Sequence, residues 1–327
     1  MKITSMWIGL VASTAAAACA ASPAPLRLEA KIPLGAVRGR IDHLAIDLGR
    51  QRLFVAELGN DSLGVVDLRQ GRVVRTLRGL REPQGIGYVP STDTVYVANA
   101  GDGSVRLFQG TKLTPVGDIA LGDDADNVRV DEAAHRLFVG YGTGGLAIID
   151  TTAGTKIADV LLRAHPESFQ LDPSGIRIFI NIPDAGVIAV ANRMTDRVVA
   201  RWTTGSLRAN FPLVFDAVHQ RLLAVFRRPP RLGVYRAGDG HLLDAFSTCR
   251  DADDLFLDAK RRRLYVICAE GVIDVMTERG MGYTDLGRIR TSLGARTGLF
   301  VPQLDELFVA VRATHATPAA IWVYRPL

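Results

Sequence analysis

The sequence predicts an all-β protein in which seven like modules close into a ring. Three observations support this prediction. A short apolar run recurs about every 42 residues, each interval holds four strand-like segments, and no helical periodicity lies between them. A ring of this kind uses the whole chain after its N-terminal region as one domain.

The recurring apolar run is the clearest of these signals. Its centres are Phe54, Tyr96, Phe138, Phe179, Leu223, Tyr265 and Phe308, spaced 41 to 44 residues apart. Each centre lies in a run such as RLFVA or VYVAN, which is rich in β-branched and aromatic residues and too short for a helix. We therefore expect a buried strand at each centre.

The other three strands of each module follow from turn residues. A short strand before each centre ends at Asp47, Pro90, Asp131, Asp172, Asp216, Asp258 or Pro302, residue types that favour tight turns. After each centre, a loop rich in Gly, Asn and Asp leads to a third strand such as LAIID and a fourth such as VVRTL. Four antiparallel strands in each of seven repeats are typical of the blades of a β-propeller.

The two ends of the chain predict how the ring closes. The seventh repeat ends with IWVYRPL, its third strand, whereas residues 26–32 precede the first inner strand and have no blade of their own. Pairing the two would remove the free sheet edges. We expect residues 26–327 to form a single seven-bladed β-propeller whose last blade takes its outer strand from the N-terminal segment.

The first residues have the pattern of a secretory leader. Lys2 precedes an apolar stretch, and Ala18-Cys19-Ala20 fits the small-x-small cleavage pattern, so residues 1–20 are predicted to be a signal peptide and 21–25 an Ala/Pro linker. The stretch is too short to span a membrane as a helix. A lipoprotein anchored through Cys19 is the less favoured alternative, because Ala16 stands where lipoproteins usually carry Leu. We expect a periplasmic or secreted protein with no transmembrane span.

The charge of the chain does not indicate nucleic-acid binding. Its formal net charge is +5, but the arginines are scattered, and the clusters at 227–231 and 261–263 lie in predicted turns. A nucleic-acid site needs a focused basic surface. We therefore expect no nucleic-acid partner.

The segments VYVANAGDGSV and RLFVAELGNDSLGVVDL resemble the repeats of the YVTN-type (YncE-like) β-propeller family. The resemblance covers the chain from about residue 26. It implies an exported or envelope protein, and many members of that family have no assigned activity. The sequence has no C-x-x-C-H motif, so a covalent c-type haem is not expected.

Polar residues collect where the chain enters each inner strand, and in a propeller these entries surround one mouth of the central channel. The candidate ligand-binding residues are Asp42, His43, Gln84, Asp126, Asn127, Glu167, Asn210, Asp253, Asp254 and Arg296. They predict a polar mouth with an acidic bias.

Two interpretations of this mouth stay open. Carboxylate and amide oxygens suit Ca²⁺ or another divalent cation, and the candidate ligands are Asp42, Asp126, Asn127, Glu167, Asn210 and Asp253. With a metal, His43 or His165 could act as acid or base in hydrolysis of a lactone or ester, as in gluconolactonase-like propellers. The simpler interpretation is that these residues cap backbone groups and solvate the rim.

Cys249 and Cys268 remain after removal of the leader, at the predicted ends of the fifth blade and of the second strand of the sixth. An exported protein can oxidise such a pair, and the sequence leaves open whether it does.

The favoured function is a non-catalytic binding scaffold, expected to be a monomer, that takes a small molecule or a cell-envelope protein at its mouth. The alternatives are a metal-dependent lactonase or related hydrolase, and an accessory to a periplasmic redox system.

Overall fold

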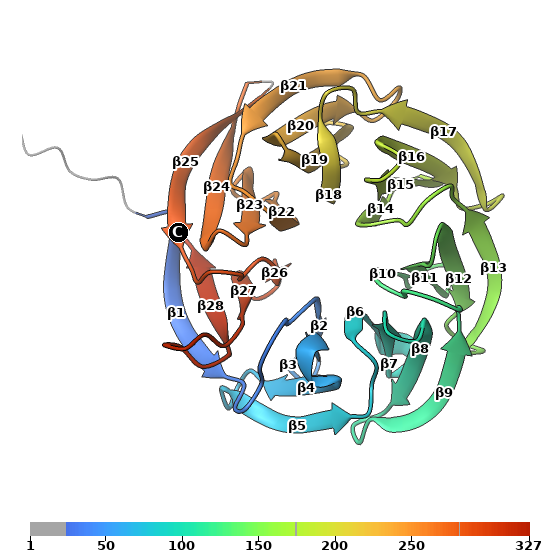
Figure 1. Ribbon diagram of the computed structural model, residues 1–327, viewed down its shortest axis with the longest axis vertical. Coiled ribbons are helices and arrows are strands. Elements are labelled where there is room, and N and C mark those ends of the chain that lie inside the picture. The colour runs from blue at the N-terminus through green and yellow to red at the C-terminus, as the bar shows by residue number, and fades with distance from the viewer. Residues whose placement is uncertain (1–23, 174, 281) are drawn as a thin grey trace, which may run out of the picture.

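The chain forms a ring of seven four-stranded antiparallel sheets, as the computed structural model shows (Figure 1). It describes residues 24–327 except 174 and 281. The predicted signal peptide, and residues 21–23 of the predicted linker, lie outside the described residues. In the part of the chain that is described, no helix is long and apolar enough to cross a membrane.

Each blade runs from an inner strand at the channel to an outer strand at the rim. The first three blades comprise β2 (Leu44–Asp47), β3 (Arg52–Glu57), β4 (Ser62–Asp67) and β5 (Arg72–Arg78); β6 (Pro83–Val89), β7 (Thr94–Asn99), β8 (Ser104–Gln109) and β9 (Thr114–Ala120); and β10 (Val128–Asp131), β11 (Arg136–Tyr141), β12 (Gly145–Asp150) and β13 (Thr155–Leu161). Short 3₁₀ helices, Leu58–Asn60 and Pro90–Thr92, follow β3 and β6.

The remaining blades follow the same order. They comprise β14 (Phe169–Leu171), β15 (Arg177–Ile182), β16 (Val187–Asn192) and β17 (Arg197–Thr203); β18 (Arg208–Asp216), β19 (Arg221–Arg228), β20 (Pro230–Arg236) and β21 (Leu242–Ser247); β22 (Ala252–Asp258), β23 (Arg263–Cys268), β24 (Val272–Arg279) and β25 (Gly282–Arg290); and β26 (Gly298–Val301), β27 (Glu306–Val311), β28 (Ala320–Pro326) and β1 (Leu26–Pro33). The predicted fold class and number of blades are confirmed.

The seven predicted centres all lie in the second strand of a blade and are buried. The turn before each of these strands explains the recurring aspartates. The backbone N–H of Arg50 donates to Asp47 Oδ1 at 3.0 Å, and that of Arg261 donates to Asp258 Oδ1 at 3.1 Å. These side chains satisfy a backbone donor of the turn, which is why Asp is favoured there.

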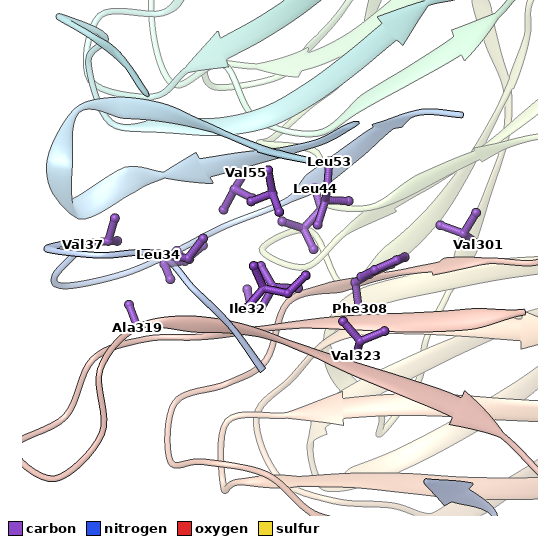
Figure 2. Close-up of a cluster of buried hydrophobic side chains, with 14 residues drawn as sticks. Ile32, Leu34, Val37, Leu44, Leu53, Val55, Val301, Phe308, Ala319 and Val323 are labelled. Atoms are coloured by element: carbon purple, nitrogen blue, oxygen red, sulfur yellow. The ribbon is translucent and has the colours of Figure 1, made fainter. Parts of the chain in front are cut away.

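The ring closes between the two ends of the chain, as predicted. β1 pairs with β28 from Leu26–Pro326 to Pro33–Ala320, with one irregularity after Leu28. Ile32 and Leu34 pack with Phe308 and with side chains of the first blade in one buried cluster (Figure 2). Each such cluster joins neighbouring blades, so the hydrophobic core is itself a ring around the channel.

Candidate functional site

A central cavity of about 450 Å³ runs between the inner strands of the seven blades. β2, β6, β10, β14, β18, β22 and β26 each pair on one side only, so their free edges face this cavity (Figure 1). An unpaired strand edge offers backbone N–H and C=O groups. The wall of the cavity is therefore rigid and partly polar even before its side chains are considered.

His43 is the centre of the mouth. Its segment is held by backbone bonds, because Asp42 N–H donates to Ala56 O at 2.8 Å and Ala56 N–H donates to His43 O at 3.1 Å. The neighbouring blade adds a bond from His43 N–H to Gln84 O at 3.3 Å. The imidazole is thereby placed at the cavity wall, with its side chain 19% exposed.

Three carboxylates from three blades surround the His43 ring. Nε2 lies 3.7 Å from Asp42 Oδ1 and 3.9 Å from Asp126 Oδ1, and Nδ1 lies 3.8 Å from Asp254 Oδ2. Burial acts to lower the pKa of His43, but the nearby Asp254, Asp42 and Asp126 outweigh it and raise that pKa to about 10. At neutral pH His43 is therefore an imidazolium that serves as the counter-ion of this acidic group.

The carboxylates around His43 have further partners of their own. Asp42, which is 1% exposed, lies 2.7 Å from Arg40 Nη2, and Asp254 Oδ2 accepts a hydrogen bond from the Gly298 N–H at 2.7 Å. Burial raises the pKa of Asp42, against the attraction of His43 and Arg40. The group thus balances its charge largely from within the chain.

Asp126 and Glu167 are less fully compensated. Burial raises the pKa of Asp126 to about 7, with repulsion from Glu167 opposed by the attraction of His43. Burial, with repulsion from Asp253, also raises the pKa of Glu167 to about 7. These two carboxyl groups therefore take up or release protons close to neutral pH.

An arginine–aspartate network occupies the blade 5 to blade 7 side of the mouth. Arg227 pairs with both Asp253 and Asp251, and Arg296 Nε lies 2.8 Å from Asp253 Oδ2. The Arg227 guanidinium also covers the ring of Phe211, 3.4 Å from its centroid. These long side chains cross between blades and fix the rim.

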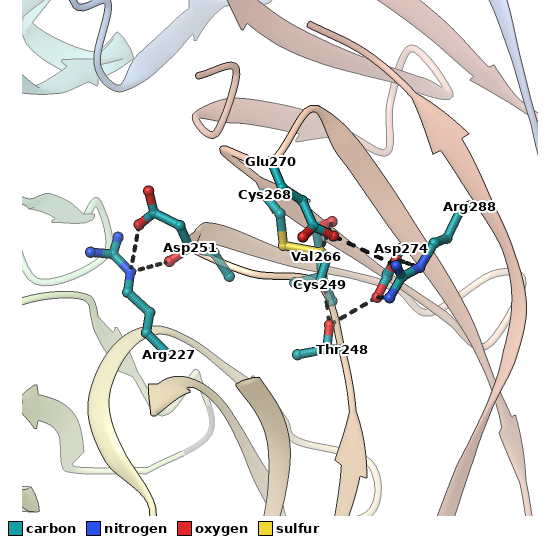
Figure 3. The surroundings of a disulfide bond; sticks show 10 residues. Arg227, Thr248, Cys249, Asp251, Val266, Cys268, Glu270, Asp274 and Arg288 are labelled. Carbon is teal, nitrogen blue, oxygen red and sulfur yellow. Dashed lines mark hydrogen bonds and ion pairs between the residues drawn. A yellow bond between two sulfur atoms is a disulfide. The ribbon is translucent and has the colours of Figure 1, made fainter. Parts of the chain in front are cut away.

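A disulfide anchors the segment that carries these aspartates. Cys249, before β22, is bonded to Cys268 at the end of β23, with the two Cα atoms 5.9 Å apart (Figure 3). Beside it, Thr248 Oγ1 donates to Asp274 Oδ2 at 3.2 Å. Cys249 and Cys268, whose pairing the sequence left open, therefore form a disulfide.

The predicted mouth residues do not all meet at one point. The structure brings His43 together with Asp42, Asp126 and Asp254, and it joins Asp253 with Arg296. Asn210 instead holds blades 4 and 5 together, because its Nδ2 donates to Asn181 Oδ1 and to Val187 O, both at 2.9 Å.

The remaining candidates lie apart from the His43 group or are buried. The Gln84 carbonyl accepts the His43 backbone bond described above, and Asn127 is buried. His165 Nδ1 lies 2.7 Å from Gly142 O and 3.6 Å from Asp124. His43 and His165 therefore have different contact partners, although both act on the pKa of Asp126.

One of the two open interpretations of the mouth gave the candidate metal ligands Asp42, Asp126, Asn127, Glu167, Asn210 and Asp253. Within residues 24–327, apart from 174 and 281, no group of three or more His, Cys, Asp or Glu side chains is arranged to hold a metal ion. The physical reason is that protein cations already take the place of a metal. Arg40 and His43 face Asp42, while Arg227 and Arg296 face Asp253.

Two polar residues of the cavity wall, Arg129 and Gln170, were missed from the sequence, and Ser168 lies beside them. A signal for Arg129 was present. It pairs with the repeat centre Phe138, and the equivalent residues beside the other centres are Ala45, Gly87, Gln170, Val214, Phe256 and Leu299. A charged residue at this position of an inner strand is therefore exceptional within this chain.

The fold and the mouth together define a seven-bladed β-propeller with a charged central channel. Comparison with models of protein families found no match, and a search of curated proteins found none. Among solved structures, the chain is similar to Kuenenia stuttgartiensis hydrazine synthase, with a TM-score of 0.72 and 16% identity over 85% of this chain and 95% of that one.

It is also similar to a chain of a mitotic checkpoint complex, with a TM-score of 0.74 and 12% identity over 96% of this chain and 98% of that one. Such low identities show the propeller fold alone, because one fold hosts many functions. The resemblance to YVTN-type repeats stays a prediction.

Proposed function

We propose that this protein is a binding scaffold that takes a small molecule into its central channel. The observation that carries the proposal is the cavity of about 450 Å³, which lies within the range of small-molecule sites and is lined by both apolar and polar side chains. Its walls are strands locked into seven sheets, so little order has to be gained on binding.

The geometry gives no support to metal-assisted hydrolysis by this site. Among the described residues no metal-ligand group exists, and His43 is held in its protonated form by three carboxylates. A general base must be able to accept a proton near the working pH. We therefore assign His43 a structural role in keeping the mouth neutral.

A ligand screen with a filled channel tests the proposal. Val214 lines the cavity from β18, so Val214→Trp places a large ring there, whereas Val199→Trp adds the same ring on the outer strand β17, where Val199 is 60% exposed. A ligand present at a hundred times its Kd adds about 2.7 kcal/mol of stability, which raises Tm by several degrees.

We expect some members of a small-molecule library to raise the Tm of the wild type and of Val199→Trp, but not that of Val214→Trp. Library members that stabilise all three proteins equally would place binding outside the channel and contradict the proposal. Circular dichroism of each variant checks that the fold is retained.

We also propose that the scaffold works outside the cytoplasm. The Cys249–Cys268 disulfide supports this, because such bonds persist in oxidising compartments. Expression of the full chain in a Gram-negative host, with fractionation and mass spectrometry of the product, tests it. We expect a periplasmic product that lacks the predicted signal peptide and has no free thiol, and retention of the full-length chain in the cytoplasm would contradict the proposal.

A further inference from the structure

Arg129 differs from the other arginines around the channel. It lies on β10, is half-buried and lines the central cavity. Its Nη1 donates to Val128 O at 2.8 Å and its Nη2 donates to Ser168 Oγ at 3.3 Å, while its guanidinium lies 5.5 Å from the centroid of the Phe169 ring. All of these partners are neutral.

No ion pair joins Arg129 to any carboxylate in the described chain. Arg40, Arg227 and Arg296 at the mouth each contact at least one carboxylate within 3.5 Å. Burial lowers the pKa of Arg129, with Asp254 and Asp126 attracting it from beyond contact distance. Arginine nevertheless stays charged, so a cation without a direct counter-ion faces the cavity.

The charges around Arg129 allow an anion to bind beside it. Of the two nearby carboxylates, Asp254 accepts a hydrogen bond from the Gly298 N–H at 2.7 Å and lies 3.8 Å from His43 Nδ1. Asp126 also faces His43. Asp254 is balanced by these partners, and Asp126, with a pKa raised to about 7, is partly neutral at neutral pH, so the repulsion of an anion beside Arg129 is reduced.

Below Asp254, the wall across the channel is apolar. Val214, Phe256 and Leu299 line the cavity from β18, β22 and β26, and Figure 1 shows β22 and β26 across the central opening from β10. Beside Arg129, Ser168 and Gln170 of blade 4 add hydroxyl and amide groups. Asp254, which precedes Phe256 on β22, and His43 also line the cavity at the mouth. Below them, the cavity is cationic and polar on one side and apolar on the other.

We propose that the channel binds a small amphipathic monocarboxylate, whose carboxylate pairs with the Arg129 guanidinium and whose apolar body lies against Phe256 and Leu299. This inference rests on the proposed function and names its ligand class. A single negative charge is expected because Arg129 is one cation and carboxylates stand close by, which disfavours a dianion. A guanidinium matches the planar carboxylate through paired hydrogen bonds.

The test uses three probes that share a six-carbon chain and differ in the head group: hexanoate, hexanamide and hexylammonium. Isothermal titration calorimetry at pH 7 compares the wild type with Arg129→Gln and with Arg201→Gln. Arg201 lies exposed on the outer strand β17, so that control removes the same charge away from the channel. Circular dichroism and Tm show whether each variant is folded.

We expect hexanoate to bind the wild type and Arg201→Gln about ten- to a hundredfold more tightly than hexanamide, the range of one charge-assisted contact. Arg129→Gln should abolish this preference and keep the weak binding of the amide. Arg129→Lys, which keeps the charge but loses the planar pair of donors, should restore part of it.

The inference is overturned if hexanamide or hexylammonium binds the wild type as tightly as hexanoate, or if Arg129→Gln binds hexanoate as the wild type does. It is also overturned if none of the probes binds. If none of the probes binds, the ligand screen decides about the proposed function. Library ligands that stabilise the wild type but not Val214→Trp would leave the proposed function intact. Ligands that stabilise Val214→Trp as well would contradict both the proposed function and this inference.

Discussion

Replacing His43 by Gln tests whether the imidazolium holds the three carboxylates of the mouth together. The variant keeps a polar side chain of similar reach but removes the positive charge between Asp42, Asp126 and Asp254. The raised pKa of His43, about 10 against an ordinary 6.5, measures how strongly the folded protein favours the charged ring. One pKa unit corresponds to 1.36 kcal/mol, so the free energy of unfolding of His43→Gln should be lower by up to about 5 kcal/mol. Removal of one partner of a buried ion pair costs about 3–5 kcal/mol, which agrees with this figure.

The pH dependence makes the test specific. Because the folded pKa is raised, the contribution of His43 to the free energy of unfolding is complete below pH 6.5 and is lost as the pH rises through about 10. The raised pKa values of Asp126 and Glu167, both about 7, give a similar fall at lower pH. The window from pH 8 to 9 therefore isolates His43, because above it the buried tyrosines, whose pKa values are also raised in the folded protein, begin to lower the stability as well.

Urea denaturation followed by tryptophan fluorescence at several pH values supplies the measurement. We expect the wild type and the exposed-loop control His241→Gln to lose stability from pH 8 to 9, and His43→Gln to start lower and stay flat over this range. Adding Asp254→Asn to His43→Gln should recover part of the loss, since one of the uncompensated charges is removed. Parallel slopes for the wild type and His43→Gln would refute the counter-ion role.

Three further predictions follow from the ring, the disulfide and the mouth. Deletion of residues 24–33 removes the outer strand of the last blade and should abolish the single cooperative unfolding transition, whereas deletion of residues 2–20 should leave it unchanged; calorimetry distinguishes the two. Cys249→Ala with Cys268→Ala should lower the free energy of unfolding by about 3 kcal/mol, as expected for opening a loop of about 20 residues, and reductant should then have no further effect. Hexanoate should bind several-fold more tightly at pH 6 than at pH 8 by calorimetry. At the lower pH Asp126 and Glu167, with pKa values of about 7, become neutral and therefore repel the carboxylate less. The other titratable groups that act on Asp126 are His43, Asp42 and His165. Equal affinities would contradict this.

The architecture could be predicted because it depends on local and repeated signals. Aspartates such as Asp47 and Asp258 mark turns through bonds to residues three positions later, and the middle of each second strand is apolar and buried. The unpaired segment before the first inner strand then had one partner available, the third strand of the last repeat. None of these inferences requires knowledge of how side chains from distant blades meet.

The site could be predicted only as far as backbone position determines it. The entries to the inner strands indicated His43 and Asp254, and both line the cavity. The sequence could not show that Arg40 and Arg227 neutralise Asp42 and Asp253, because long flexible side chains cross between blades in directions that residue type does not specify. From the sequence, metal binding therefore stayed open as one interpretation of the acidic rim, whereas the structure shows that arginines of the chain face these carboxylates.

This internal neutralisation changes where function is expected in the molecule. At the rim, Asp42, Asp253 and Asp254 already face His43 or an arginine, so an incoming ion would have to displace a bonded partner. Deeper in the channel the situation is reversed, because Arg129 has neutral partners only. A ligand that pairs with Arg129 gains a charge-assisted contact without breaking an existing ion pair. The rim then serves to hold the channel open and electrically balanced, and the selective contact is made below it.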